Sequence, residues 1–329
     1  MRTPMSIMLT VSIRTLLFAV LFFSHAHAAH ENPVAPLLPG MNEIEDFGGN
    51  PGNLAMHVYQ PEKHTTGRLP LVVALHGCGG SAEHFSRAGF NELAEKYGFQ
   101  VLYPEQKSEN HPGRCFNHLL PDDPEAGDRE FDSIMQMIHY LVSKHRASRR
   151  NLFITGFSSG GQVANILAAT YPEIFRAAAI IGAGGYVCET GHKGIKGFVA
   201  CFGAKPAKKK RRYLSPGQEA GHWPRISIWH GKNDRNVPYT RVSLALKQWK
   251  KVHKVRQKKH VKMSLPGNIS YEAYKGPGGK SLVELYTMNS AAHIIPIQPQ
   301  KQCGRPGQYF SEEKICYAKH IIRFFGLIK

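Results

Sequence analysis

Apolar runs alternate with segments of helical periodicity along most of the chain. The segment 129–145, REFDSIMQMIHYLVSKH, repeats apolar residues every three or four positions, as a helix packed on a sheet does. Runs such as LPLVVAL at 69–75 suit buried strands instead. Strands that alternate with helices predict an α/β class protein with a mostly parallel central sheet and helices on both faces.

The expected elements follow one another without an internal repeat. Strands are expected at 54–61, 69–80 with its glycine turn, 100–105, 151–156, 177–185 and 225–239 with its polar exit loop, and a hairpin at 269–288. Helices are expected at 90–99, 129–145, 161–172, in the basic stretch that follows residue 239, and at 315–328. Since no Ser/Thr- or Pro-rich linker interrupts this order, we expect one catalytic domain over residues 29–329.

The first 28 residues have the features of a secretory signal peptide. Arg2 and Arg14 supply positive charge, TLLFAVLFF forms a short apolar core, and the residues 26–28, Ala-His-Ala, fit a cleavage site. The apolar core is shorter than the roughly 20 residues that a membrane span needs. We therefore expect a secreted or periplasmic protein, with an uncleaved anchor as the alternative.

A serine lies in a sharp turn between an expected strand and an expected helix. Residues 156–160 read Gly-Phe-Ser-Ser-Gly, a G-x-S-x-G motif in the strand–turn–helix context that gives it meaning. Small residues let the backbone bend, and a helix that begins near Gly161 would direct its N-terminus at Ser158. We interpret Ser158 as a nucleophile; the alternative is a glycine-rich turn without chemistry.

A nucleophilic serine needs a base and a carboxylate that orients the base. In α/β-hydrolases the chain order is serine, then acid, then histidine. Asp234 is the only aspartate after Ser158 and lies in the loop HGKNDRNVP, just past an expected strand. The histidines that follow it are His253, His260, His293 and His320. We predict His293, in the loop after the last strand, as the base, with His320 as the alternative.

Two backbone N–H groups are candidates for stabilising the charged intermediate. One belongs to Ser159, directly after the nucleophile. The other belongs to Cys78 in the loop LHGCGG, which follows an earlier strand. The alternative interpretation is that HGCGG is only a turn that ends a strand.

Six cysteines follow the predicted signal peptide, and an even number in an exported protein favours disulfides. Six cysteines allow 15 pairings. We predict that neighbours along the chain pair: Cys78 with Cys115, Cys188 with Cys201, and Cys303 with Cys316. No C-x-x-C spacing occurs, so we expect no metal site.

The chain is strongly basic, with a formal net charge of +18. Part of the excess lies in the runs 205–212 (KPAKKKRR) and 247–262. Such runs could bind polyanions, whereas the simpler interpretation is a solvated loop and the exposed face of a helix. We expect no nucleic-acid partner, no membrane partner after signal cleavage, and leave the oligomeric state open.

From about residue 69 to residue 327 the sequence resembles the poly(3-hydroxybutyrate) depolymerase family of esterases, which is related to feruloyl and acetylxylan esterases. The motifs that carry the resemblance are LVVALHGCGG, GFQVLYPEQ, CFNHLLPDD, GFSSGGQVANILAATYPEIF, HGKNDRNV and AAHIIPIQP followed by CG. The C-terminal segment resembles the depolymerases more than the feruloyl esterases.

The resemblance implies an α/β-hydrolase fold and a secreted serine esterase without a cofactor. It implies a triad of Ser158, Asp234 and His293, and an oxyanion hole at Cys78 and Ser159. Substrate contacts would come from the stretch Phe116, Asn117 and His118, where the family has other aromatic residues. The implied substrates are short 3-hydroxyacyl esters: small esters, soluble oligomers or amorphous polymer, because no polymer-binding domain follows the match. The alternatives are a feruloyl or acetylxylan esterase, and a catalytically dead protein that binds polyanions.

Overall fold

The computed structural model describes residues 40–63, 66–117, 125–185, 223–255 and 260–328. The described residues belong to one compact unit, which spans 37–329. The predicted signal peptide, His118, Cys188, Cys201 and the basic run 205–212 lie outside the described residues. The predicted domain boundary after residue 28 therefore stays a prediction.

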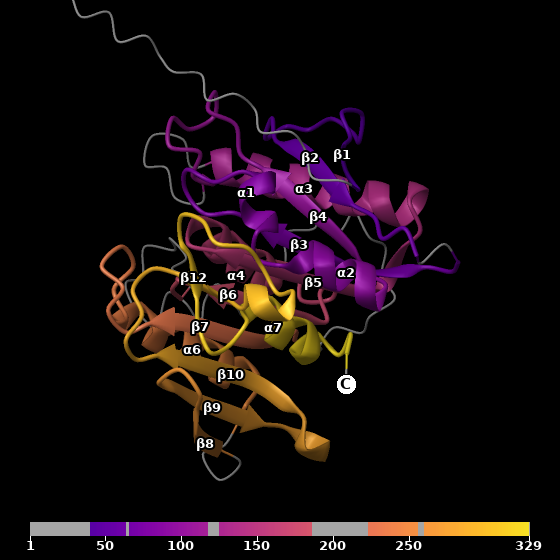
Figure 1. Ribbon diagram of the computed structural model, residues 1–329. Helices are drawn as coiled ribbons and strands as arrows, with labels where there is room; N and C mark the ends of the chain where they lie inside the picture. Colours follow the sequence, from indigo (N-terminus) through magenta and orange to yellow (C-terminus); the bar gives the residue numbers. More distant parts are fainter. Residues whose placement is uncertain (1–39, 64–65, 118–124, 186–222, 256–259, 329) are drawn as a thin grey trace, which may run out of the picture. The chain divides into compact units, whose positions relative to one another are not determined.

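A ten-stranded sheet with the order β1-β2-β4-β3-β5-β6-β7-β10-β9-β8 forms the centre of this unit (Figure 1). Its six central strands, from β4 to β10, pair in parallel, and the strands at both ends of the order pair antiparallel. The strands are β1 (Met41–Glu43), β2 (Ala55–Tyr59), β3 (Leu69–Leu75), β4 (Gln100–Glu105), β5 (Ala147–Phe157), β6 (Ala177–Ile181), β7 (Arg225–Gly231), β8 (His260–Leu265), β9 (Ile269–Lys275) and β10 (Ser281–Met288). The mostly parallel sheet predicted from the sequence is confirmed.

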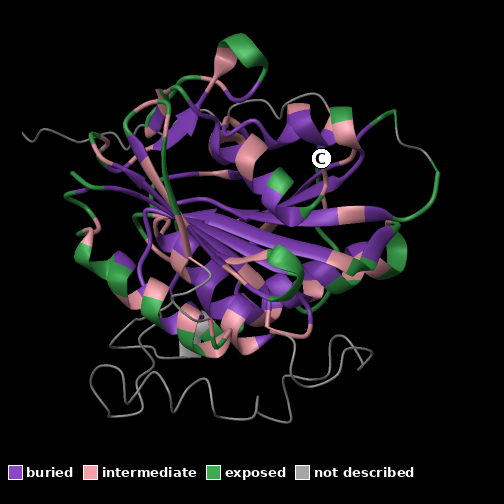
Figure 2. Cartoon of the chain, turned by 90° about the horizontal axis from the view of Figure 1, so that it is seen from below, coloured by how far each residue is buried: buried purple, intermediate pink, exposed green. Residues whose placement is uncertain are grey.

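Helices cover both faces of the sheet, as predicted. Successive residues of a strand point to opposite faces, so Val73 belongs to the apolar cluster beneath α3, α4 and α6, whereas Val72 belongs to the cluster beneath α1, α2 and α7. Buried residues run through the sheet and exposed ones lie on the outer helix surfaces (Figure 2). The helices are α1 (Ala82–Ser86), α2 (Phe90–Tyr97), α3 (Glu125–Lys144), α4 (Ser159–Thr170), α6 (Thr240–Val252) and α7 (Tyr317–Phe325). None of the helices in the described ranges has the length and apolar composition of a membrane span.

Some elements differ from the sequence prediction. The basic segment 247–262 does not form one helix face: α6 ends at Val252, and His260 begins the edge strand β8, which pairs with β9. Helix α4 begins at Ser159 rather than near Gly161. Short elements were missed, namely β1, α1 and the separate two-stranded sheet of β11 (Ile295–Ile297) and β12 (Phe310–Glu312). Elements this short carry too few residues for a periodic pattern.

Two disulfides hold segments near the carboxyl ends of the strands. The bond Cys78–Cys115 joins the loop after β3 to the segment after β4, and Cys303–Cys316 closes the segment before α7. Both pairings were predicted and are confirmed. The third predicted pairing, 188–201, lies outside the described residues.

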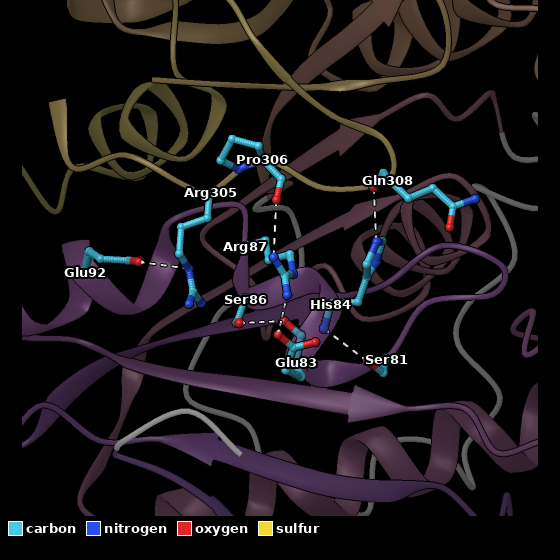
Figure 3. A network of polar contacts seen from close by, with 9 residues as sticks. All are labelled: Ser81, Glu83, His84, Ser86, Arg87, Glu92, Arg305, Pro306 and Gln308. Atoms are coloured by element: carbon cyan, nitrogen blue, oxygen red, sulfur yellow. Dashed lines mark hydrogen bonds and ion pairs between the residues drawn. The ribbon is translucent and has the colours of Figure 1, made fainter. Parts of the chain in front are cut away.

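The segment before α7 is also anchored to α1 by polar contacts (Figure 3). Arg87 donates to the Pro306 carbonyl at 3.2 Å, and His84 Nε2 donates to the Gln308 carbonyl at 3.1 Å. Arg87 also pairs with Glu83, one turn earlier on the helix, at 3.1 Å. These contacts fix the backbone just before Tyr309, whose ring packs against His293.

The fold leaves no room for a side chain where α4 crosses β3. A Cβ at Gly160 would lie 2.2 Å from the His76 carbonyl oxygen and 2.4 Å from the Leu75 carbonyl oxygen, both backbone atoms that cannot turn aside. We expect Gly160→Ala to lower the free energy of unfolding by about 3 kcal/mol, because overpacking forces the helix from the sheet. Urea unfolding measures the loss.

The matched control is Gly49→Ala, whose new Cβ would lie 3.9 Å from its nearest neighbour. It is expected to stay within about 0.5 kcal/mol of the wild type. Equal urea midpoints for the wild type and Gly160→Ala would show that the tight crossing is not needed.

Candidate active site

A strained turn carries the predicted nucleophile. Strand β5 ends at Phe157, helix α4 begins at Ser159, and Ser158 between them has φ 54° and ψ −119°. Residues other than glycine rarely occupy this region, and such strain persists mainly at functional sites. The Ser158 N–H donates to the Ile181 carbonyl of β6 at 2.9 Å, which fixes the turn to the sheet. The side chain is left half-exposed at the carboxyl end of the strands.

Glycines allow three backbone segments to meet at this turn. A Cβ at Gly156 would lie 2.3 Å from the Gly160 carbonyl oxygen, so the strand and the helix could not approach as they do. A Cβ at Gly77, in the loop after β3, would lie 3.1 Å from the Ser158 Cβ. The loop of residues 76–80, which we call the oxyanion loop, therefore lies directly against the serine turn.

The predicted acid and base meet across two loops. Asp234 follows β7 and His293 follows β10, and the adjacent parallel strands bring the two loops together. A Cβ at Gly231 would lie 2.1 Å from the Ala292 carbonyl oxygen, so this glycine permits the close contact. His293 Nδ1 donates to Asp234 Oδ2 at 2.6 Å, and both side chains are buried. This hydrogen bond leaves His293 Nε2 as the nitrogen that could accept a proton.

The environment of Asp234 keeps its carboxyl ionised. Burial alone would raise the pKa of this carboxyl, but hydrogen bonds from His230, His293 and the Val237 N–H outweigh burial and hold the pKa well below its usual value. His230 Nε2 lies 3.3 Å from Asp234 Oδ2 and donates to the Val237 carbonyl at 2.8 Å. Asp234 is therefore a fixed negative charge facing the imidazole of His293.

The imidazole of His293 lies beside the serine turn. Its ring centroid is 4.5 Å from that of Phe157, and a Cβ at Gly182 would lie 2.8 Å from its Cε1. Tyr309 packs edge-on against the same imidazole at 5.8 Å. Ser158 Oγ has no hydrogen bond to any described residue, so its contact with His293 Nε2 is not formed in this structure. Hydrogen bonds of this kind often tighten only when substrate binds.

The backbone N–H groups of the two predicted oxyanion donors have no acceptor among the described residues. Ser159 is the first residue of α4, where backbone N–H groups have no acceptor within the helix. Within the described part of the chain, the Cys78 N–H has no acceptor either. The oxyanion loop is held by the Cys78–Cys115 disulfide and by the Gly79 N–H, which donates to the Gly113 carbonyl at 2.7 Å.

A buried histidine ties the oxyanion loop to the end of β4. His76 Nδ1 donates to the Gly77 carbonyl at 2.7 Å, and its Nε2 accepts from the Gln106 N–H at 3.0 Å. Burial lowers the pKa of His76 to about 4, so the ring is neutral near pH 7 and can accept at Nε2. These two hydrogen bonds connect the oxyanion loop to the residue that follows β4.

Two of the residues predicted to contact substrate, Phe116 and Asn117, are buried rather than exposed at the site. Phe116 is 1% exposed and packs beneath the oxyanion loop against His76, at 4.9 Å between ring centroids. Asn117 is also buried, and its backbone N–H donates to Glu130 at 2.8 Å. Their contact with substrate stays a prediction, and His118 lies outside the described residues.

The sequence prediction missed two buried polar residues near the site. His230 precedes Asp234 by four residues in the motif WHGKND, a spacing that could have indicated the contact. Glu130 is 2% exposed inside α3, where the apolar pattern of the helix hides it. The alternative base, His320, packs against Trp229 and Tyr286 and makes no contact with Asp234 in the described residues. No group of three or more His, Cys, Asp or Glu side chains in the described ranges could hold a metal ion.

Comparison with known proteins shows which sequences this chain resembles. A family model described as Esterase PHB depolymerase matches residues 54–203. Poly(3-hydroxyalkanoate) depolymerase C of Paucimonas lemoignei is 33% identical over 296 residues, which cover 88% of this chain and 70% of that protein. Acetylxylan esterase of Coprinopsis cinerea is 31% identical over 278 residues, covering 80% of this chain and 72% of that protein.

Solved structures share the fold. The acetyl xylan esterase from Aspergillus awamori matches with a TM-score of 0.63 at 23% identity, covering 88% of this chain and 99% of that one. An S-formylglutathione hydrolase from Agrobacterium tumefaciens matches with a TM-score of 0.52 at 15% identity, covering 89% and 98%. The predicted α/β-hydrolase fold and the predicted family are thus both confirmed. This chain belongs to the Esterase PHB depolymerase family and is a carboxylic-ester hydrolase.

Proposed function

We propose that the protein is an exported serine esterase that hydrolyses short 3-hydroxyacyl esters, including poly(3-hydroxybutyrate) or its oligomers. Ser158, His293 and Asp234 act as nucleophile, base and orienting acid. The observation that carries the proposal is the 2.6 Å hydrogen bond between His293 and Asp234, beside a serine held in a strained turn. No cofactor takes part in this chemistry.

The reaction proceeds in two halves. Ser158 Oγ attacks the ester carbonyl while His293 Nε2 takes the hydroxyl proton, and Asp234 stabilises the imidazolium that forms. The Cys78 and Ser159 N–H groups donate to the oxyanion. The intermediate then expels the alcohol, which receives the proton from His293. Water activated by the same imidazole attacks the acyl-enzyme, releases the acid and restores Ser158.

The choice of substrate rests on the relatives. The depolymerase of Paucimonas lemoignei supports hydroxyacyl esters, and its similarity spans 88% of this chain. A second candidate is an esterase of acetyl or feruloyl groups on plant polysaccharides, which the acetylxylan esterase of Coprinopsis cinerea favours at 31% identity. Both candidates use the same triad and differ only in the ester that the site accepts.

Export to the periplasm or the medium is part of the proposal. The bonds Cys78–Cys115 and Cys303–Cys316 are typical of proteins that fold in oxidising compartments. The features of a signal peptide in residues 1–28 support the same location.

A substrate panel tests the proposal. We expect the purified protein to hydrolyse 3-hydroxybutyrate trimer with a kcat/KM at least about tenfold above that for feruloylated or acetylated xylo-oligosaccharides, a difference of about 1.4 kcal/mol in the barrier. A fluorophosphonate probe should label Ser158, as located by peptide mass spectrometry. The reverse order of substrates would support the second candidate, and labelling elsewhere would contradict the assigned nucleophile.

A further inference from the structure

A buried carboxylate inside α3 receives hydrogen bonds from two separate segments. Glu130 Oε1 accepts from Gln106 Nε2 at 2.5 Å and from Asn117 Nδ2 at 2.7 Å, and Oε2 accepts from the Asn117 N–H at 2.8 Å. Gln106 follows β4, whereas Asn117 follows the cysteine that is bonded to the oxyanion loop. One side chain thus fixes two segments that are otherwise irregular.

Both segments are joined to the oxyanion loop. The Gln106 N–H donates to His76 Nε2 at 3.0 Å, and Gln106 Nε2 also donates to the Cys115 carbonyl at 3.2 Å. Cys115 is bonded to Cys78, whose N–H is the proposed oxyanion donor. A displacement of either segment would therefore move the loop that carries this N–H.

The arrangement is costly, which argues against a purely packing role. No Lys, Arg or His in the described residues forms an ion pair with Glu130, and burial raises the pKa of its carboxyl to about 7. The hydrogen bonds from Gln106 and Asn117 and the charge of Arg129 lower this pKa but do not outweigh burial. A buried carboxyl, charged or neutral, destabilises a fold unless its oxygens are hydrogen-bonded. An apolar residue would suit the interior of α3 better, unless the three hydrogen bonds serve the site.

We propose that Glu130 is the positioning residue of the oxyanion hole: its carboxyl fixes Gln106 and Asn117, and through them the place of the Cys78 N–H. This inference rests on the proposed function, since it assumes the oxyanion hole described there. Glu130 does not touch substrate. It acts by holding the oxyanion loop where the Cys78 N–H can donate to the oxyanion of the tetrahedral intermediate.

The test is Glu130→Gln, which keeps the shape but replaces one acceptor oxygen with a donor that faces amide N–H groups. We expect kcat to fall about 10- to 100-fold, as for a displaced oxyanion donor, and KM to change by less than about threefold. Affinity for butyl boronic acid, whose tetrahedral adduct occupies the oxyanion hole, should fall by a similar factor. Each rate is divided by the concentration of active sites that react with the fluorophosphonate, so that unfolded protein does not lower the measured kcat.

Glu284→Gln is the matched control, because Glu284 is also buried, has a raised pKa and accepts a hydrogen bond from Tyr271, but lies on β10. It should keep the wild-type kcat. Asn117→Ala is the second variant: a kcat loss at constant KM supports positioning, whereas a raised KM at constant kcat would contradict it.

The failure of this inference can be told from failure of the proposed function. If Ser158→Ala is inactive while Glu130→Gln keeps the wild-type kcat and boronate affinity, only the role of Glu130 is wrong. If Ser158→Ala remains active, the proposed function itself is wrong. An equal loss of kcat in Glu284→Gln would also overturn the inference, since any buried carboxyl would then have the same effect.

Discussion

Ser158→Ala is expected to lower kcat on 4-nitrophenyl butyrate by about 10⁵-fold, with the fold intact. The reason is that the Ser158 hydroxyl is the proposed nucleophile, and without it no acyl-enzyme forms and His293 has no proton to take. A residual rate above that of water would come from the oxyanion hole and from substrate binding alone. Initial rates and fluorophosphonate labelling measure the loss.

A companion variant separates chemistry from stability. Ser158→Gly should be as inactive as Ser158→Ala, yet more stable by about 1 kcal/mol, because glycine adopts φ 54° without the strain of a side chain. Ser243→Ala, which removes an exposed hydroxyl on α6, should retain full activity. Wild-type turnover by Ser158→Ala would remove the basis of the proposed mechanism.

The architecture was predictable because buried apolar residues dominate the central strands. Parallel strands buried on both faces, such as LPLVVAL in β3, leave little ambiguity once helices alternate with them. The same regularity fixes where loops gather, so the side chains of Ser158, Asp234 and His293 could be chosen from their places after β5, β7 and β10. Chain order then left Asp234 as the only aspartate, whereas His293 was chosen over three other histidines because it lies in the loop after the last strand.

Contacts between residues that lie far apart in the sequence and meet through irregular segments were not predictable in the same way. Glu130 looks like a polar break in an amphipathic helix, and only the structure shows that Gln106 and Asn117 donate to it. Tyr309 lies 16 residues beyond His293, across a short strand and a disulfide, yet it packs on the imidazole. No periodic pattern connects residues that meet through irregular segments.

Asp234→Asn is expected to lower kcat by about 10⁴-fold while KM changes little. An asparagine amide can present either its NH₂ or its oxygen to His293. It carries no charge to stabilise the imidazolium that forms during attack. The Asn236 and Val237 N–H groups, which donate to Asp234 Oδ1 at 2.9 and 2.8 Å, would hold the amide oxygen and leave the NH₂ facing His293. The imidazole would then be held with Nδ1 unprotonated and Nε2 unable to accept a proton. Stopped-flow rates of acylation measure the effect.

The control is Asp46→Asn, which changes an exposed carboxyl far along the chain from the site and should leave kcat unchanged.

A second readout for Asp234→Asn is the pH dependence of the unfolding free energy. Because the folded-state pKa of Asp234 lies below its unfolded value of about 3.9, the ionised carboxyl stabilises the fold above that pH, and the contribution is lost as pH falls toward the folded pKa. The difference in unfolding free energy between wild type and Asp234→Asn should therefore shrink between pH 6 and pH 3. A difference that stays constant over this range, together with an unchanged kcat, would mean that Asp234 is not the charge that supports His293.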